Sequence, residues 1–254
     1  MSQLIQRRDL VLALVARELK VRYRRSAIGF AWTMLQPLVT MLVLTLVFSS
    51  IFRFDVVNYP VYVLSGLLFW NFFSQGTVSA MNSLRGNAQL LQRLPVPRWI
   101  FPVATILAGL VNLVLAMVPL TVILLVTGHP VRPSLLFLGI SILIVAIFTL
   151  GVALLVSPLA VFFADVVELV GVVLTLLMYV TPVFYPISIV PESYRWVIRF
   201  NPMRSLLEVF RDPIYLGKLP PLSHFLVAAV LAIALLGVGA TLFRRISNRI
   251  PFHV

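Results

Sequence analysis

Residues Ile100–Thr127 read IFPVATILAGLVNLVLAMVPLTVILLVT and contain no charged side chain. A helix of about 20 apolar residues crosses the hydrocarbon core of a bilayer, so this run is long enough to span a membrane. The run lacks the alternation of polar and apolar residues that marks a barrel strand, which leaves an α-helix as the spanning form. The number of such runs therefore decides the fold.

The rest of the chain has the composition of a membrane protein. Of its 254 residues, 61% are hydrophobic and only 11% are charged, whereas soluble domains are far more polar. We therefore predict an all-α polytopic membrane protein that forms a single transmembrane domain over residues 1–254. Its six predicted transmembrane helices are Ile28–Phe52, Val61–Leu84, Ile100–Thr127, Leu135–Phe163, Val166–Pro186 and Leu222–Phe243.

Basic residues are distributed unevenly around these predicted spans. The segment before the first span, the loop between the second and third spans, and the tail at 244–254 hold thirteen of the 20 Lys and Arg residues. The two short loops on the opposite side hold only Arg53 and Arg132. The positive-inside rule therefore places both termini in the cytoplasm. Because the basic residues flank apolar spans, we expect them to meet anionic lipid head groups, and we expect no nucleic-acid partner.

The first 26 residues form a candidate amphipathic helix. On a helical wheel one arc holds Leu4, Ile5, Val11, Leu12, Val15 and Leu19. A basic amphipathic helix before a span is typical of a segment that lies in the cytoplasmic interface of the membrane. A solvated leader that only directs insertion is the alternative. The basic residues that we assign to the interface helix are Arg17, Lys20 and Arg22.

The loop between the second and third spans reads QLLQRLPVPRW, from Gln89 to Trp99. Pro95 and Pro97 remove backbone donors and fix φ, so a helix that enters this loop near Gly86 must end near Leu94. Such a short amphipathic helix can dock into a groove on a soluble partner. An ordinary positively charged cytoplasmic loop is the alternative. The residues that we assign to docking are Gln89, Leu90, Arg93, Leu94, Pro95, Pro97 and Arg98.

The residue types offer little support for catalysis or ion coupling. The chain has no cysteine, eight acidic residues and three scattered histidines, and no pair has metal-ligand spacing. We therefore expect no catalytic residue and no metal site. Ion-coupled carriers place ionisable groups in mid-membrane, whereas the polar side chains in the middle of these spans are amides and hydroxyls. The amides include Gln36, Asn71, Gln75 and Asn112.

Several stretches resemble one family of membrane proteins. They are RELKVRYRRSAIGFAWTMLQPL (17–38), LPVPRW (94–99), FFADVVEL (162–169), MYVTPVFYPI (178–187) and FNPM (200–203). In this order they resemble characteristic parts of ABC-2 type exporter permeases, and the most similar subgroup is the polysaccharide and O-antigen permeases. The family usually has a basic residue before the aspartate of the fourth-to-fifth turn, where this chain has Ala164.

The resemblance implies a half-transporter of a bacterial cytoplasmic membrane. Members of the family work as homodimers of six-helix subunits bound to two copies of a separate ABC ATPase, which holds ATP and Mg²⁺. The sequence contains no G-x-x-x-x-G-K-[ST] phosphate loop, and we expect no cofactor in this chain. The implied substrate is a lipid-linked polysaccharide such as O-antigen, capsule or a teichoic-acid-like glycan. Export of small lipids or drugs, a proton-coupled carrier and a lipid-modifying enzyme are the alternatives.

The long segment 187–221 contains two predicted short helices. The first is Glu192–Phe200, and the second is capped by Asn201, starts at Pro202 and ends near Arg211. Two short helices with a tight break between them fit a re-entrant hairpin in the outer leaflet. The resemblance favours this form over helices that float on the outer surface, because the family places gate helices here. The residues that we assign to the external gate are Asn201, Pro202 and Arg204.

Aromatic side chains cluster near the predicted outer ends of the second and fifth spans. The aromatic belt of the membrane interface explains most of them. A subset is a candidate lining for the substrate path, because the C–H faces of sugar rings pack on aromatic rings. We assign Tyr179, Tyr185 and Trp196 to this path. We expect the path to lie between two subunits, with the first and fifth spans near the two-fold axis.

Overall fold

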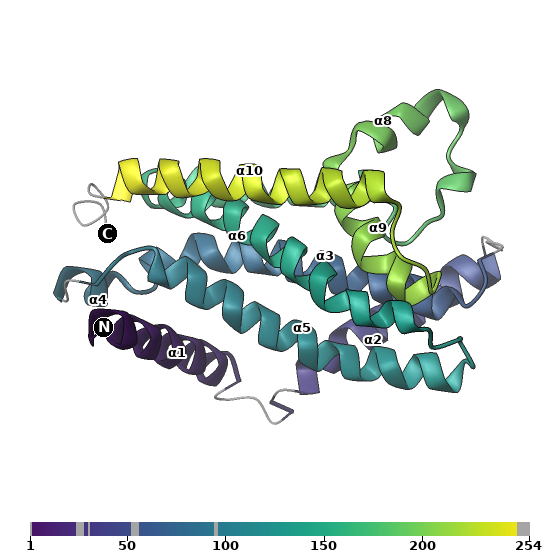
Figure 1. Cartoon of the computed structure of the whole chain (residues 1–254), viewed down its shortest axis with the longest axis horizontal. Helices are drawn as coiled ribbons and strands as arrows, with labels where there is room; N and C mark the ends of the chain where they lie inside the picture. Colours follow the sequence, from purple (N-terminus) through teal and green to yellow (C-terminus); the bar gives the residue numbers. More distant parts are fainter. Residues whose placement is uncertain (1, 24–27, 30, 52–55, 94–95, 248–254) are drawn as a thin grey trace.

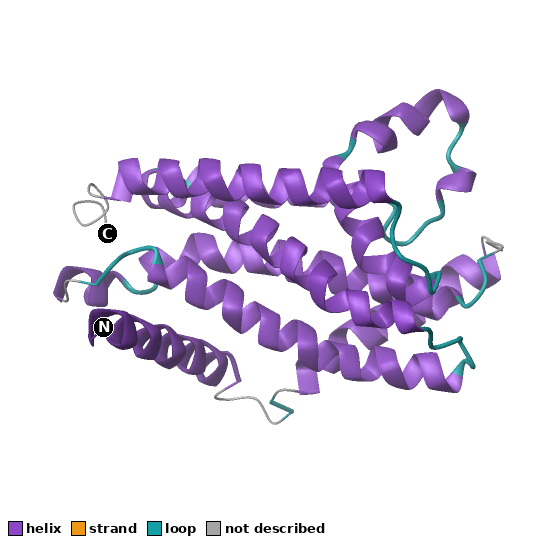
Figure 2. Cartoon of the chain, in the orientation of Figure 1, coloured by secondary structure: helices purple, strands orange, loops and turns teal. Residues whose placement is uncertain are grey.

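The computed structural model describes residues 2–23, 28–29, 31–51, 56–93 and 96–247, and this part of the chain contains no β-strand (Figure 2). Its α-helices are α1 (Ser2–Tyr23), α2 (Ala31–Thr45), α3 (Tyr59–Arg85), α4 (Ala88–Arg93), α5 (Ile100–Val126), α6 (Leu138–Phe162), α7 (Asp165–Val180), α8 (Arg195–Phe200), α9 (Pro202–Tyr215) and α10 (Leu222–Ser247). Shorter turns accompany them: the π-helix η1 (Leu46–Ile51) and the 3-10 helices η2 (Pro133–Phe137), η3 (Ile187–Ile189) and η4 (Glu192–Tyr194). The all-helical fold predicted from the apolar runs is confirmed.

The long helices lie side by side along one axis (Figure 1). Helix α3 is central and packs against α2, α5, α6, α7 and α9, while α6 packs along α10. The N-terminal end of α1, helix α4 and the C-terminal end of α10 lie together at one end of the bundle, which we call the α4 end. Helices α8 and α9 lie at the opposite end, which we call the α9 end.

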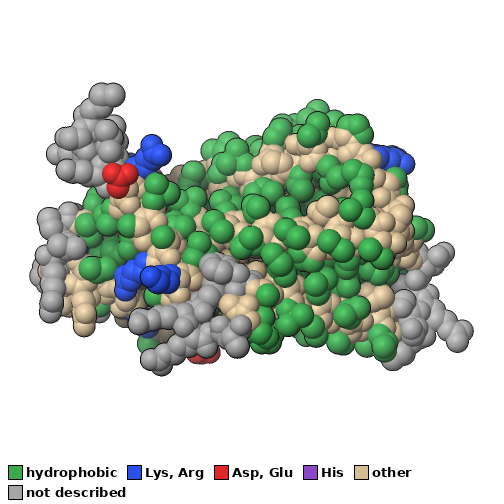
Figure 3. Space-filling view, turned by 90° about the horizontal axis from the view of Figure 1, so that it is seen from below, with side chains coloured by type: hydrophobic (Ala, Val, Ile, Leu, Met, Phe, Trp, Pro, Cys, Tyr) green, Lys and Arg blue, Asp and Glu red, His purple; other side chains and the backbone are tan. Residues whose placement is uncertain are grey.

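Four helical segments of the described chain are long and apolar enough to cross a membrane. They are Ala31–Phe48, α5, Pro133–Phe162 and α10, which coincide with the predicted first, third, fourth and sixth spans. Helix α3 has 27 residues, or about 40 Å at 1.5 Å per residue, but it also carries polar side chains. Helix α7 has 16 residues. In Figure 3 hydrophobic side chains cover most of one face, and Lys and Arg lie towards its ends.

The predicted fifth span is too long. Helix α7 ends at Val180 rather than Pro186, and Thr181 is extended, with ψ of 131°. The physical reason is Pro182, because a proline disfavours the helical conformation of the residue before it. The segment that follows turns back across the α9 end towards α8 (Figure 1).

The predicted end of the second external helix at Arg211 is also wrong. Helix α9 continues through Pro213 to Tyr215. A proline inside a helix leaves the carbonyl four residues earlier without its usual N–H donor. Here that carbonyl belongs to Val209, and it accepts a hydrogen bond of 2.7 Å from the Ser141 hydroxyl on α6. The neighbouring helix thus replaces the bond that Pro213 cannot make.

Two glycines allow α6 and α10 to pack with their backbones in contact. A Cβ atom on Gly239 would lie 2.3 Å from the Gly151 carbonyl oxygen. A Cβ atom on Gly151 would lie 2.6 Å from the backbone of Leu235 and Leu236. Small residues at such crossings allow close van der Waals packing, which replaces the hydrophobic effect as a driving force inside a membrane.

Helix α1 packs alongside α5 (Figure 1). Its inward face includes Val11, Val15 and Leu19 of the predicted apolar arc, which are half-buried, whereas Leu12 is exposed. Leu14, which the wheel did not place on the arc, packs into a small hydrophobic cluster with α4 and α5. The assignment of α1 to a membrane interface stays a prediction.

Candidate functional site

The exposed side of α3 is polar. Residues at helical spacing along this side are exposed or half-buried, and all but Val78 are polar: Asn71, Ser74, Gln75, Val78, Ser79, Asn82 and Arg85. The outward sides of α2, α5 and α10 carry leucine, valine and isoleucine instead. Amides and hydroxyls are costly against lipid. We call Asn71, Ser74, Gln75, Ser79 and Asn82 the polar face of α3.

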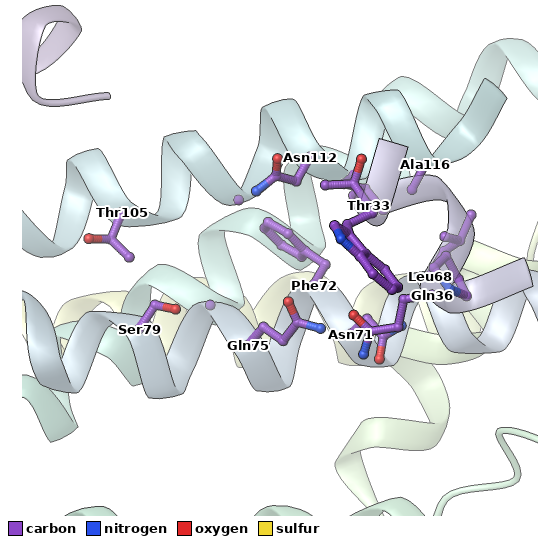
Figure 4. Close-up of a pocket in the computed structure, with 15 residues that line it drawn as sticks. Thr33, Gln36, Leu68, Asn71, Phe72, Gln75, Ser79, Thr105, Asn112 and Ala116 are labelled. Carbon is purple, nitrogen blue, oxygen red and sulfur yellow. The ribbon is translucent and has the colours of Figure 1, made fainter. Parts of the chain in front are cut away.

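A pocket of about 330 Å³ adjoins the polar face, between α2, α3 and α5 (Figure 4). It brings together four side-chain amides that are far apart in the sequence: Gln36, Asn71, Gln75 and Asn112. In Figure 4, Asn71 and Gln75 project from α3, and Asn112 faces them from α5. The remaining lining includes the hydroxyls of Thr33, Ser79 and Thr105 and the aromatic rings of Trp32 and Phe72. We call this the amide pocket.

A second hollow, of about 370 Å³, lies on the other side of the polar face, between α3 and α7. Gln75 and Ser79 line both this hollow and the amide pocket. The α7 side is formed by Gly171, Leu174, Thr175 and Met178. Gln75 and Ser79 of the polar face therefore lie between two adjoining hollows.

The chemistry of these hollows is that of uncharged hydrogen bonding. No charged side chain is among the residues that line them. Side-chain amides offer both donors and acceptors, and hydroxyls do the same. Among the described residues, no three His, Asp or Glu side chains are grouped so that they could hold a metal ion. The site can bind a neutral hydroxylated molecule, but it lacks an acid/base pair for catalysis.

At the α9 end, Asn201 joins two helices. Its side-chain oxygen accepts a hydrogen bond of 2.9 Å from the Met203 N–H, which confirms the predicted cap of α9. Its amide nitrogen donates a 2.9 Å hydrogen bond to the Thr181 hydroxyl, at the end of α7. Pro202 is the first residue of α9, as predicted. No pattern in the sequence indicated the contact with Thr181.

Arg211 holds α9 against the centre of the bundle. Its guanidinium is buried, donates hydrogen bonds to the Pro182 carbonyl at 2.8 Å and to the Val183 carbonyl, and lies 4.0 Å from the centre of the Tyr62 ring. A Cβ atom on Gly66 of α3 would lie 2.2 Å from this guanidinium, so the glycine makes room for it. The arginine satisfies two backbone carbonyls of the segment that follows α7.

The remaining predicted residues of the α9 end are not gathered at one point. Arg204 forms an ion pair of 2.7 Å with Glu208 on its own helix. Tyr185 donates a hydrogen bond of 2.8 Å to the Tyr179 carbonyl, so these two path candidates are neighbours. Trp196 is 60% exposed on α8, which projects from the bundle (Figure 1). Helix α9 is largely buried, whereas α8 is largely exposed.

At the α4 end, α1 and α4 meet in a shallow groove. Leu10, Ala13, Leu14 and Arg17 of α1 face Gln89 and Leu90 of α4 across it. Arg17 donates a hydrogen bond of 2.6 Å to the side-chain oxygen of Asn87, just before α4. The structure thus brings the predicted interface helix and the predicted docking helix together.

The docking candidates differ in how free they are to contact a partner. Gln89 is exposed, but Leu90 is half-buried and packs into the chain's own small cluster. The Arg98 guanidinium donates a hydrogen bond to the Ser247 carbonyl at the end of α10, Lys20 is exposed, and Pro97 precedes α5. Leu94 and Pro95, and the side chains of Arg22 and Arg93, lie outside the described residues.

The polar face of α3 was not predicted as a site, although a signal for it exists. Asn71, Gln75 and Ser79 recur at intervals of four residues, which places them on one side of a helix. A helix that packs in the middle of a bundle and exposes such a row differs from its apolar neighbours.

The family model of the ABC-2 type transporter matches residues 9–215. The chain belongs to the ABC-2 type transporter family. It is 32% identical to the O-antigen export system permease protein RfbA of Myxococcus xanthus, over 95% of this chain and 94% of the relative. It is 29% identical to a protein of the same name from Klebsiella pneumoniae, over 95% and 93%. It is 23% identical to the polysialic acid transport protein KpsM of Escherichia coli, over 92% of each chain.

The ABC-2 assignment covers every feature of the site. The matched residues include the α1–α4 groove, the amide pocket, the polar face of α3 and helix α9. The relatives named above, which the sequence matches over nearly its full length, are export and transport proteins. The polar face is therefore part of a membrane permease fold.

Proposed function

We propose that the chain is the permease subunit of an ATP-driven exporter that moves lipid-linked polysaccharide outward across a bacterial cytoplasmic membrane. The observation that carries the proposal is the polar face of α3, with its two adjoining hollows. Amides and hydroxyls can hydrogen-bond successive sugar hydroxyls without the strong attraction of fixed charges. The names of the relatives, which include O-antigen export permeases and a polysialic acid transport protein, support a glycan as substrate.

In this proposal six helical segments cross the membrane: α2 with η1, α3, α5, α6, α7 and α10. The α4 end faces the cytoplasm, because basic residues gather there: Arg85 ends α3, Arg98 precedes α5, and Arg244 and Arg245 lie in the last turn of α10. The N-terminal end of α1 and the C-terminal end of α10 both lie at this end (Figure 1). Helix α9 then dips into the outer leaflet as a re-entrant helix.

The working unit in this proposal is a homodimer with the path between subunits. Helix α7 supports it, because Leu174 is its single buried residue, and Leu169, Val172, Val173 and Leu176 are exposed. Leu174 lines the hollow between α3 and α7, and a second copy packed on the exposed side of α7 would enclose that hollow. The first and fifth spans would then lie near the two-fold axis.

In this proposal transport is driven by two copies of a separate ABC ATPase, which bind ATP and Mg²⁺ and dock at the α1–α4 groove. Gln89 is the best position to test, because it is exposed in the groove. We expect Gln89→Asp to weaken ATPase binding about tenfold, or by roughly 1.4 kcal/mol. Ser193→Asp adds the same carboxylate at the exposed η4 turn and serves as the control. Equal ATPase binding by both variants in a titration would contradict docking at this groove.

The function itself is tested with the permease and its ABC ATPase in proteoliposomes that contain lipid-linked glycan. We expect glycan to cross only with ATP and both subunits. During turnover, Gln75→Cys on the polar face should react with a hydrophilic thiol reagent, whereas Val118→Cys, on the apolar side of α5, should not. Transport driven by a proton gradient without the ATPase would refute the proposal.

A further inference from the structure

The amide pocket has the chemical character of a site for one sugar residue. Three helices contribute amides to it, at Gln36 on α2, Asn71 and Gln75 on α3, and Asn112 on α5. A hexose presents several hydroxyl groups that each donate and accept, and a side-chain amide can answer both roles at once. A carboxylate or a guanidinium offers only acceptors or only donors.

The amides of α3 are available to a ligand. Within the described part of the chain, the side chains of Asn71 and Gln75 make no hydrogen bond to another group of the protein. Gln75 is exposed and Asn71 is half-buried. Polar groups in an apolar setting are normally hydrogen-bonded. Both amides line the amide pocket, and Figure 4 shows them on the same side of α3.

The amide pocket also contains aromatic rings, which can pack against the apolar face of a sugar. Trp32 and Phe72 line the same pocket as the amides. Trp32 is 48% exposed, so its ring is accessible. Sugar rings have hydroxyl edges and apolar C–H faces, and a site with amides beside an indole matches both kinds of surface. The large flat ring of a tryptophan contributes much of the contact area in such sites.

The size and charge of the pocket limit which ligands it can bind. Its volume of about 330 Å³ lies at the small end of the range of roughly 300–1,000 Å³ for ligand pockets, which fits a sugar residue rather than a folded polymer. None of its lining residues carries a charge. The basic residue of α3 nearest along the helix is Arg85, ten residues beyond Gln75, or about 15 Å. An acidic or phosphorylated sugar would find no counter-charge among the described residues that line the pocket.

We propose that the amide pocket binds an uncharged sugar residue of the glycan, with its hydroxyls on the amides of α2, α3 and α5 and its ring face on Trp32. This inference rests on the proposed function and adds a selectivity to it. The pocket favours neutral over acidic sugars, and it holds the glycan beside the polar face of α3 during passage.

The test is calorimetry with the full-length permease in nanodiscs of phosphatidylethanolamine and phosphatidylglycerol, which carry no sugar head group. The probes are neutral pentasaccharides of glucose, mannose and galactose, with a galacturonate pentasaccharide as the acidic probe. We expect at least one neutral probe to bind with millimolar or better affinity and the acidic probe not to bind. Binding of the acidic probe as tight as the best neutral probe, or no neutral binding at all, overturns the inference.

Matched variants locate the binding. We expect Asn71→Leu and Gln75→Leu each to weaken neutral binding about tenfold, the effect of one lost hydrogen bond. Gln92→Leu makes the same kind of change on α4, away from the pocket lining and the polar face, and should leave binding unchanged. Trp32→Leu should also weaken binding, and Trp99→Leu, at the start of α5, should not. Equal effects of the pocket variants and their controls would overturn the inference.

Two further outcomes distinguish a sugar site from a contact between subunits and from a failure of the proposed function. If Asn71→Leu converts a dimer to monomers, the amides join subunits and the pocket is not a sugar site. Export is scored separately, in proteoliposomes with the ABC ATPase. Normal ATP-driven export without any sugar binding would refute the sugar site and leave the proposed function standing. Failure of the permease to bind an ABC ATPase would refute the proposed function itself.

Discussion

Asn201 is the most informative residue to change, because one side chain holds both α7 and α9. It is 7% exposed, accepts from the Met203 N–H and donates to the Thr181 hydroxyl, each at 2.9 Å. Asn201→Ala removes both bonds. Loss of the cap costs about 1 kcal/mol, and loss of the neutral hydrogen bond costs about 1 kcal/mol more. The total of about 2 kcal/mol corresponds to about 30-fold in the equilibrium between docked and undocked α9.

The assay measures how often α9 leaves its place. The native chain has no cysteine, so a single cysteine can report on one position. Leu206 lies in the middle of α9 and is fully buried, whereas Trp196 on α8 is 60% exposed. The labelling rate of a buried cysteine by an impermeant thiol reagent follows the population of the open form when opening is fast. We expect Asn201→Ala to speed labelling of Leu206→Cys by up to about 30-fold and to leave Trp196→Cys unchanged.

Two companion variants divide the effect. Asn201→Ser keeps an oxygen that caps the helix, but its side chain is too short to reach Thr181. It should therefore speed labelling of Leu206→Cys only about fivefold, which corresponds to about 1 kcal/mol. Thr181→Val removes the same bond from the other side and should match it. Asn82→Ala, near the α4 end, is the control. Unchanged labelling of Leu206→Cys in Asn201→Ala would refute the idea that Asn201 holds α9 in its docked position. An equal increase in the labelling rate of Trp196→Cys would refute it as well.

Two other predictions test how the bundle is held together. Gly239→Ala should prevent stable folding, measured as loss of the monodisperse peak in detergent, because its Cβ would lie 2.3 Å from the Gly151 carbonyl; Gly237→Ala, which meets open space, should be tolerated. Arg211→Met should lower the free energy of unfolding by about 3–6 kcal/mol, the sum of two charge-assisted hydrogen bonds, whereas Arg199→Met on exposed α8 should change it by less than about 0.5 kcal/mol. Equal denaturation midpoints for the two arginine variants would contradict the anchoring role.

The membrane helices could be predicted because a bilayer demands length and apolarity. The runs that became α2, α5, α6 and α10 each satisfy both demands, and tertiary contacts have little power to override them. The end of helix α4 was predictable for a different reason, because Pro95 and Pro97 restrict the local backbone whatever the tertiary packing. The Asn201 cap was predictable because it depends only on residues two positions apart.

What could not be predicted depends on contacts between distant segments. Helix α9 passes through Pro213 because Ser141, far away in the sequence, supplies a donor to the Val209 carbonyl. Leu90, a predicted docking residue, packs against the same small hydrophobic cluster as Leu14 of α1, and that contact also joins distant segments. The amides of Gln36 and Asn112 were visible as uncharged polar groups within spans, but their meeting in one pocket requires the packing of α2 and α5 on α3.

The low hydropathy of α3 follows from its place in the bundle. Helices that face lipid must be apolar on their outward sides, because an unsatisfied polar group is expensive there. Helix α3 is covered by α2, α5, α6, α7 and α9, so its neighbours screen it from lipid and it can carry amides and hydroxyls on the side that remains. Length favours a span, with 27 residues in one continuous helix. The polar side chains that lower the hydropathy of α3 therefore mark the side that faces something other than lipid, and we propose that this side faces the path of the substrate.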